Sequence, residues 1–205
     1  MYSPAAFQVE DRETLTAFIR RHSFATIITQ DDGVHHATQM PVLFREHKGT
    51  PGRLVSHLAR ANPQWRHFEK DEEVLVLFTG PHAYVSPAWY VTTPAVPTWN
   101  YTAVHVYGRP HLITDHDAFA AMLHELIEFN EAGRPGRWNG EMPDEFRDHL
   151  MKAIVGFEIE ITKIEGKFKL SQNRPADAPG IIAALSESED QTEREVAAMM
   201  RHLMP

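Results

Sequence analysis

The sequence predicts an α+β domain built around a small antiparallel β-barrel, with helices at its periphery. Segments with strand-like alternation or short apolar runs recur along most of the chain, and turn residues separate them. Only a few segments between them have helical periodicity. The length of 205 residues, with 42% hydrophobic and 23% charged residues, fits one globular domain with at most a helical appendage.

The first part of the chain predicts a helix followed by strands. Asp11 is a suitable N-cap for a helix over 11–22. An Asp-Asp-Gly turn around Gly33 favours a hairpin between the first two strands. The strands expected here are 24–30, 35–44 and 52–59, and a short helix begins at Asn62 and Pro63.

The second part of the chain predicts longer strands and the clearest helix. The continuous apolar run at 73–78 indicates a strand covered on both faces. The elements expected after it are a strand at 101–113, a helix at 115–131, a long strand at 155–171 and a C-terminal helix at 191–203. In the long strand the apolar positions change from odd to even numbers, which predicts a bulge or turn near Thr162 and Lys163.

Charge and composition exclude several classes of function. The formal charge of −8 makes direct DNA binding unfavourable, because phosphate backbones are bound by clustered Lys and Arg. The absence of cysteine excludes disulfides, thiolate catalysis and thiolate metal sites. Neither a signal peptide nor a membrane-spanning run is expected, so a cytoplasmic protein without membrane contact is the default expectation.

The segment VPTWNYTAVHVYG, residues 96–108, carries an unusual strand face. Val104 and Val106 share one side, whereas Tyr101, His105 and Tyr107 share the other. A solvated face would more often carry Lys, Glu and Thr. The neighbouring connection, with Trp89, Tyr90, Trp99 and Tyr101, is equally compatible with a subunit interface, stacking against a planar ligand, or core packing under a loop.

Two further segments are candidate anion sites. In SHLARANPQW, Arg60 stands beside a helix start at Asn62, an arrangement that can bind an anion or simply cap a helix. In GKFKLSQNR, the residues Lys167, Lys169 and Ser171 are expected to point away from the apolar side and to form a basic face, although a solvated lysine edge fits the pattern equally well. The thirteen histidines show no metal-ligand spacing, so no metal centre is expected.

Several of these segments together resemble the PaiB family of FMN-binding negative transcriptional regulators. The residues that carry the resemblance are MYSPAAF, HLARANPQW, FTGPHAYVSPAWY, VPTWNYTAVHVYG and IVGFEIEITKIEGKFKLSQNR. They occur in the family's order and span nearly the whole chain.

The resemblance implies a split β-barrel of the flavin-reductase or pyridoxamine-phosphate-oxidase type. A homodimer would bind two FMN molecules at its subunit interface. The phosphate would lie at His57, Ala59, Arg60 and Asn62, and the isoalloxazine ring at Trp99, Asn100 and Tyr101. Lys167, Lys169, Ser171 and Gln172 would approach the flavin from the same or the second subunit. We expect residues 1–175 to form the barrel domain and 176–205 a helical extension packed on it.

Three functions remain open from the sequence. The chain could be an FMN-binding dimer with an indirect regulatory role, a small FMN-dependent oxidoreductase, or a haem-binding or haem-degrading protein. No acid–base pair can be assigned, although His57, His105 and Tyr101 are candidates.

Overall fold

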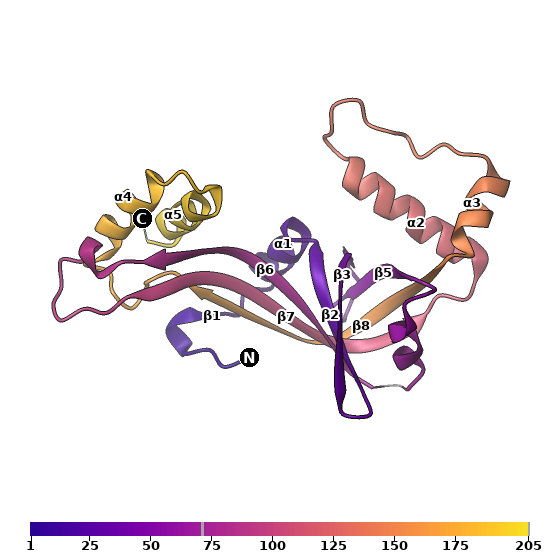
Figure 1. The fold of residues 1–205 in the computed structure, drawn as a ribbon, viewed down its shortest axis with the longest axis horizontal. Coiled ribbons are helices and arrows are strands. Elements are labelled where there is room, and N and C mark those ends of the chain that lie inside the picture. Colours follow the sequence, from indigo (N-terminus) through magenta and orange to yellow (C-terminus); the bar gives the residue numbers. More distant parts are fainter. Residues whose placement is uncertain (71, 205) are drawn as a thin grey trace. The chain divides into compact units, whose positions relative to one another are not determined.

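The computed structural model describes residues 1–70 and 72–204, and it confirms the predicted α+β class (Figure 1). The described residues form an eight-stranded sheet in the order β3-β2-β6-β7-β8-β5-β4, with β1 paired to β8. The strands are β1 Gln8–Val9, β2 Phe24–Asp31, β3 Val34–Pro41, β4 Leu43–Arg45, β5 Arg53–Ala59, β6 Val74–Val85, β7 Thr98–Leu112 and β8 Ile154–Lys169. The helices are α1 Arg12–Arg21, α2 His116–Glu131, α3 Asp144–Met151, α4 Ala178–Ser186 and α5 Gln191–Leu203, with short 3-10 helices η1 Ala5–Phe7, η2 Pro63–Lys70 and η3 Pro87–Trp89.

The chain forms two compact units. Unit 1 comprises residues 1–18, 79–105 and 165–205, and unit 2 comprises residues 19–78 and 106–164. The helices α4 and α5 thus belong to unit 1. The predicted division at residue 175 into a barrel domain and an extension stays a prediction. Among the described residues, no helix combines the length and the apolar character needed to cross a membrane.

Unit 2 begins with the predicted hairpin. Asp32 and Gly33 both have positive φ, 47° and 79°, which is the backbone of a two-residue turn matched to strand twist. Helix α2 packs Phe119, Met122 and Leu126 into the core that lines β4 and β5. A Cβ at Gly156 would lie 2.5 Å from the Phe119 ring, so the glycine permits the close approach of α2 to β8.

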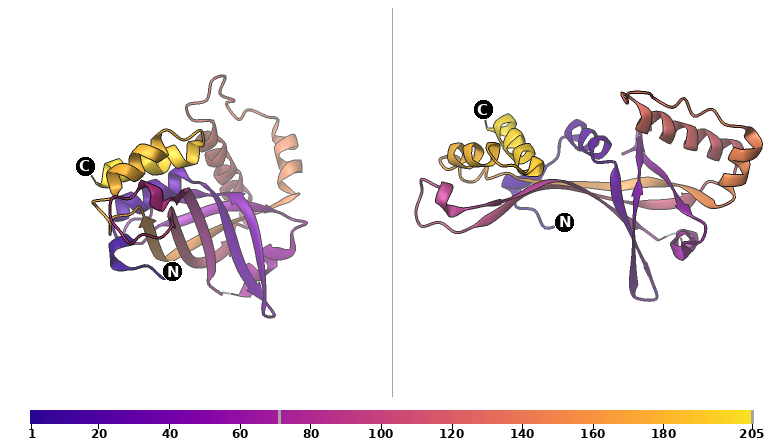
Figure 2. Two further views of the ribbon diagram at one scale, coloured as in Figure 1. Left: turned by 60° about the vertical axis from the view of Figure 1, so that its left-hand side comes forward. Right: turned by 45° about the horizontal axis from the view of Figure 1, so that its top comes forward.

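Unit 1 packs helices on one side of its strands. Figure 2 shows α4 and α5 as a packed pair on one side, and the N-terminal segment on the other. Met200 of α5 contacts Asn100 of β7, with 3.5 Å between Sδ and Nδ2. Phe18 of α1 packs on Phe168, with 5.2 Å between the ring centroids.

The burial pattern changes phase once in β6 and once in β8. In β6 the buried residues change from even numbers, ending at Phe78, to odd numbers including Ala83. In β8 they change from odd numbers, ending at Ile161, to even numbers including Phe168, and residues 162–163 are both exposed. The predicted change of phase is therefore confirmed, although β8 continues through it as one strand. Each change falls where the strand passes from one unit to the other, since different elements cover it there.

Some elements differ from the sequence prediction. The predicted strand 35–44 divides into β3 and β4 at Val42, because β3 pairs with β2 whereas β4 pairs with β5. Helix α3 was not predicted, and α4 was expected only as part of the helical extension 176–205, without bounds of its own. The sequence of α4 contains Pro179 and Gly180, which usually argue against a helix. Proline is tolerated here because it lies in the first turn.

Candidate functional site

Unit 1 carries an exposed cluster of aromatic rings on the adjacent strands β6 and β7. The ring of Trp99 lies 6.0 Å from the rings of both His82 and Tyr84, measured between centroids. Tyr84 is 42% and Trp99 53% exposed. Tyr101 follows Trp99 on the same side of β7. We call His82, Tyr84, Trp99 and Tyr101 the aromatic face. Exposed rings in this arrangement offer a platform on which a planar molecule can stack.

The alternation predicted for the strand at 101–107 is confirmed. Val104 and Val106 are fully buried, whereas Tyr101, His105 and Tyr107 are only partly buried. The buried side of β7 in unit 1 faces the C-terminal helix through Asn100 and Met200. The aromatic face therefore lies on the side of β7 opposite to α5.

Lys167 and Lys169 bring positive charge to the aromatic face. The Nζ of Lys167 lies 5.1 Å from the Tyr101 ring centroid and donates a hydrogen bond to the backbone oxygen of Tyr2 at 3.1 Å. Lys167 is only 8% exposed, so it is not a solvated edge lysine. Lys169 contacts Thr98 Oγ1, and burial, assisted by the charge of Lys167, lowers the pKa of its ammonium group. These cations favour an anionic or electron-rich ligand group nearby.

His105 lies on the same side of β7 as Trp99 and Tyr101 of the aromatic face. Burial lowers the pKa of its imidazole, and the N-terminal ammonium group lowers it further. The folded protein therefore favours the neutral ring, which can both donate and accept a proton. His105 therefore stays a candidate acid–base group.

Three of the predicted flavin-contacting residues do not point to the aromatic face. The Asn100 side chain is fully buried, and its Nδ2 donates to Ser171 Oγ at 3.0 Å. Ser171 has a positive φ of 64° because the chain turns after β8, and this turn directs its hydroxyl inward. Gln172 is bound to its own turn, since its Nε2 donates to the Phe168 carbonyl and its Oε1 accepts the Leu170 N–H. Ser171 thus departs from the expected basic face.

The predicted phosphate segment lies in unit 2, where β5 leads into η2. Arg60 uses its guanidinium structurally: Nε donates to the Lys152 carbonyl at 2.8 Å, and Nη2 to the Ile154 carbonyl at 2.9 Å. Asn62 caps η2 by accepting the Gln64 N–H at 3.0 Å. The helix-cap alternative therefore describes Asn62, and two of the guanidinium nitrogens of Arg60 are already engaged.

His57 and Arg60 line different cavities. His57 contributes to a cavity of about 720 Å³ together with α2 and α3. Arg60 lines a second cavity of about 560 Å³ together with Trp65 and His116. Ala59, which ends β5, is exposed and paired with Ile154 across to β8. The four predicted phosphate residues are therefore not gathered around one cavity.

Some residues of the aromatic face were missed in the sequence. His82 and Tyr84 lie in the quoted segment GPHAYV, but the phase change of β6 concealed which of its side chains are exposed. Tyr2 lies near Lys167, with 5.7 Å between Nζ and its ring centroid, and nothing in the local sequence predicts this long-range contact. In the ranges 1–70 and 72–204, no group of His, Asp or Glu residues could hold a metal ion.

Comparisons with known proteins agree with the predicted family. A family model described as "Putative FMN-binding domain" matches residues 1–163. The Bacillus subtilis protein named Protease synthase and sporulation protein PAI 2 is 39% identical over 203 residues, which cover 98% of this chain and 96% of that protein.

Two solved structures share the fold. The flavocytochrome Anf3 from Azotobacter vinelandii superposes with a TM-score of 0.62 at 18% identity, over 79% of this chain and 69% of that chain. A protein from Mycobacterium smegmatis that is described as binding FAD and heme gives a TM-score of 0.58 at 20% identity, over 79% of this chain and 73% of that chain. These similarities confirm the predicted split-barrel fold class.

Proposed function

Because the chain belongs to the PaiB family of FMN-binding split-barrel proteins, we propose that its aromatic face binds the isoalloxazine ring of FMN. The observation that carries this proposal is the exposure of Trp99 beside the rings of His82 and Tyr84, with the buried Lys167 at the neighbouring Tyr101. A flavin ring that stacks on Trp99 and Tyr84 would bury these two partly exposed side chains. A cation such as Lys167 would favour the negative charge that a reduced flavin carries.

A homodimer is proposed for the same unit. Unit 1 exposes large apolar side chains that a monomer would leave in water: Tyr2, Tyr84, Val91, Val96 and Trp99. A second copy placed against this surface would cover them. Placement of FMN at the dimer interface stays a prediction from the family resemblance, as does a cytoplasmic location.

The cellular role proposed is an indirect negative regulator. Lys163, Lys167 and Lys169 form a basic strip along β8, and two of them lie at aromatic rings: the Nζ of Lys163 is 5.5 Å from the Tyr107 ring centroid, and that of Lys167 is 5.1 Å from the Tyr101 ring centroid. Such a strip offers few phosphate contacts to DNA, and the formal charge of −8 opposes them. We therefore propose regulation through a protein partner or through the state of the flavin.

A second candidate function is a small flavin oxidoreductase. The observation that favours it is the neutral imidazole of His105 on the same side of β7 as Trp99 and Tyr101. The flavin would supply the hydride chemistry, and this chain would orient the ring and hold a proton at His105. Oxidation of NAD(P)H by the FMN-loaded protein, lost in a His105→Phe variant, would support this function.

The main proposal is tested by titrating the protein with flavin and measuring binding from the quenching of the flavin fluorescence. FMN should bind wild-type protein, and Trp99→Ala should weaken binding of both FMN and riboflavin about tenfold, because both ligands share the ring. Trp138→Ala is a matched control, since Trp138 is 45% exposed but lies in unit 2. If the control variant lost as much flavin affinity as Trp99→Ala, or if Trp99→Ala lost none, the flavin ring would not lie on the aromatic face. An absorption spectrum with a Soret band would instead indicate haem.

A further inference from the structure

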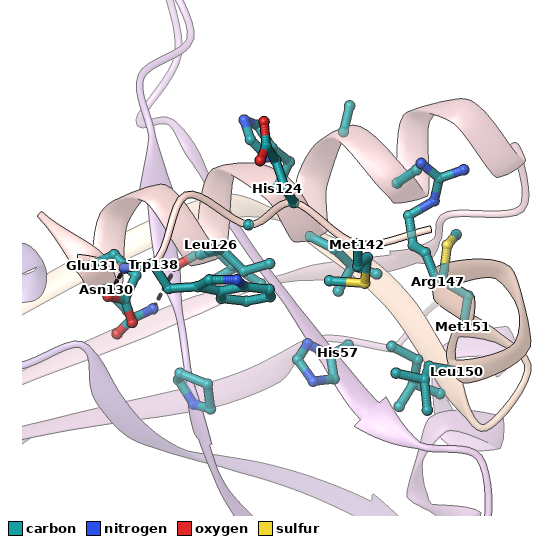
Figure 3. Close-up of a pocket in the computed structure, with 18 residues that line it drawn as sticks. His57, His124, Leu126, Asn130, Glu131, Trp138, Met142, Arg147, Leu150 and Met151 are labelled. Carbon is teal, nitrogen blue, oxygen red and sulfur yellow. Dashed lines mark hydrogen bonds between the residues drawn. The ribbon is translucent and has the colours of Figure 1, made fainter. Parts of the chain in front are cut away.

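Unit 2 contains a cavity that the flavin proposal does not use. It has a volume of about 720 Å³ and lies between β5, α2, the segment 138–142 and α3. Figure 3 shows His57 pointing from β5 into this space, with Trp138 to one side, Met142 above and Leu150 to the other side. Cavities of this size accommodate drug-sized organic molecules.

His57 supplies a polar group at the base of the cavity. Its Nδ1 is buried and has no hydrogen-bond partner among the described residues. Such an atom destabilises the folded protein unless a ligand or water satisfies it. Burial lowers the pKa of the imidazole, which favours the neutral ring at neutral pH. A neutral ring can pair with an uncharged donor or acceptor, but it offers no charge to an anion.

The rest of the lining is mainly apolar. The side chains that give this character are Leu123, Leu126, Ile127, Met142, Leu150, Met151 and Ile154. The charged Arg147 is held by Asp144 at 2.8 Å and by Asp148 at 2.9 Å. The Glu131 carboxylate accepts a hydrogen bond from the backbone N–H of Trp138, which holds the start of the segment 138–142. The charges of Arg147 and Glu131 are therefore engaged within the protein.

We propose that this cavity is a second small-molecule site, which binds an uncharged, largely apolar organic molecule through one hydrogen bond to the imidazole of His57. The volume, the apolar lining and the unsatisfied nitrogen each point to this class of ligand. FMN does not fit it, because its phosphate would meet a neutral imidazole and an arginine already paired to two carboxylates. A ligand could therefore bind at this site whether or not flavin is bound.

The experiment uses the neutral fluorescent ketone prodan as the probe, with the full chain. Prodan should bind wild-type protein with a blue-shifted emission, and excess FMN should not displace it. His57→Leu should weaken prodan binding about three- to tenfold, the loss of one hydrogen bond. Ala121→Trp, which enlarges an exposed residue at the cavity lining, should abolish binding without disturbing the core. His47→Gln, at an exposed turn of the same unit, is the matched control and should bind as wild type does.

Thermal denaturation gives an independent readout. Without a ligand, His57→Leu should melt at a higher temperature than wild type, because leucine removes the unsatisfied buried nitrogen. A structural histidine would give the opposite result, so a lower melting temperature for this variant would overturn the proposal. Unchanged prodan binding by Ala121→Trp would also overturn it. Displacement of prodan by FMN would show that this is the flavin site and not a second one.

Discussion

Arg60 offers the sharpest test, because its guanidinium has a structural role that the phosphate prediction did not include. Its Nε and Nη2 donate to the carbonyls of Lys152 and Ile154, and its backbone N–H donates to the Ala153 carbonyl at 2.8 Å. Arg60→Ala removes the two side-chain bonds and keeps the backbone bond. The turn between α3 and β8 should therefore lose part of its support while the strand pairing survives.

The magnitude follows from these contacts. A hydrogen bond from a charged donor contributes roughly 1.5–3 kcal/mol when shielded, but Arg60 is exposed, so about 1 kcal/mol for each bond is appropriate. Arg60→Ala should then lower the free energy of unfolding by about 2 kcal/mol, and the melting temperature by roughly 4–8 °C for a chain of this size. Circular dichroism during heating measures this shift.

Arg60→Lys is the matched variant that separates structure from ligand binding. Lysine keeps the positive charge but cannot bridge two carbonyls with a planar fork, so its melting temperature should also fall. If Arg60 binds the FMN phosphate, Arg60→Ala should lose about tenfold or more in the preference for FMN over riboflavin, whereas Arg60→Lys should keep part of it. An alanine variant that melts like wild type would refute the structural reasoning. One that keeps the full preference for FMN would place the phosphate elsewhere.

Three further outcomes are expected. Tyr84→Glu should weaken the proposed homodimer, measured by sedimentation, because it places a charge in the surface that the second copy covers; unchanged association would show that the interface lies elsewhere. Gly156→Val should lower the melting temperature, because its side chain would overlap the Phe119 ring; an unchanged melting temperature would mean that α2 can shift without loss. Hydrogen bonds from the Thr92 side chain and from the backbone of Thr92 and Val91 hold the pKa of Asp177 below its ordinary value of 3.8. The carboxylate therefore adds stability above about pH 4 that is lost as the pH falls through the lowered pKa, and Asp177→Asn should flatten this acid dependence in denaturant titrations.

Local pattern was sufficient for the elements whose two faces differ along the whole strand. The strand at 101–107 was predicted with its correct buried side, because Val104 and Val106 meet the core throughout. β6 was less readable, since its buried side changes near Gly80 and the exposed ring of Tyr84 then falls on an unexpected position. Helix α4 was not delimited within the expected helical extension, because Pro179 and Gly180 conceal its start.

The contacts of Arg60 and Lys167 could not be predicted from the sequence, because they join residues that are far apart along the chain. The carbonyls that hold Arg60 lie more than ninety residues away, at separations of 92 and 94. The backbone of Tyr2 meets Lys167 at a separation of 165. Such pairings arise from strand order, and no local spacing predicts them. The aromatic face was thus only partly visible in the sequence.

The division of the predicted phosphate segment follows from where β5 ends. His57 lies on β5, whereas Arg60 follows Ala59, the last residue of that strand, and belongs to the turn. The structure gives them different cavities. The His57 cavity is mainly apolar, and the Arg60 cavity contains His116, Lys152, Asp115 and Asp148 as well. Because an anion is favoured where a cation remains available to it, we expect a phosphate bound by this segment to lie at Arg60 and not at His57. The His57 cavity then requires a different occupant. Its lining is mainly apolar, and the charges of Arg147 and Glu131 are engaged within the protein, which favours a neutral occupant.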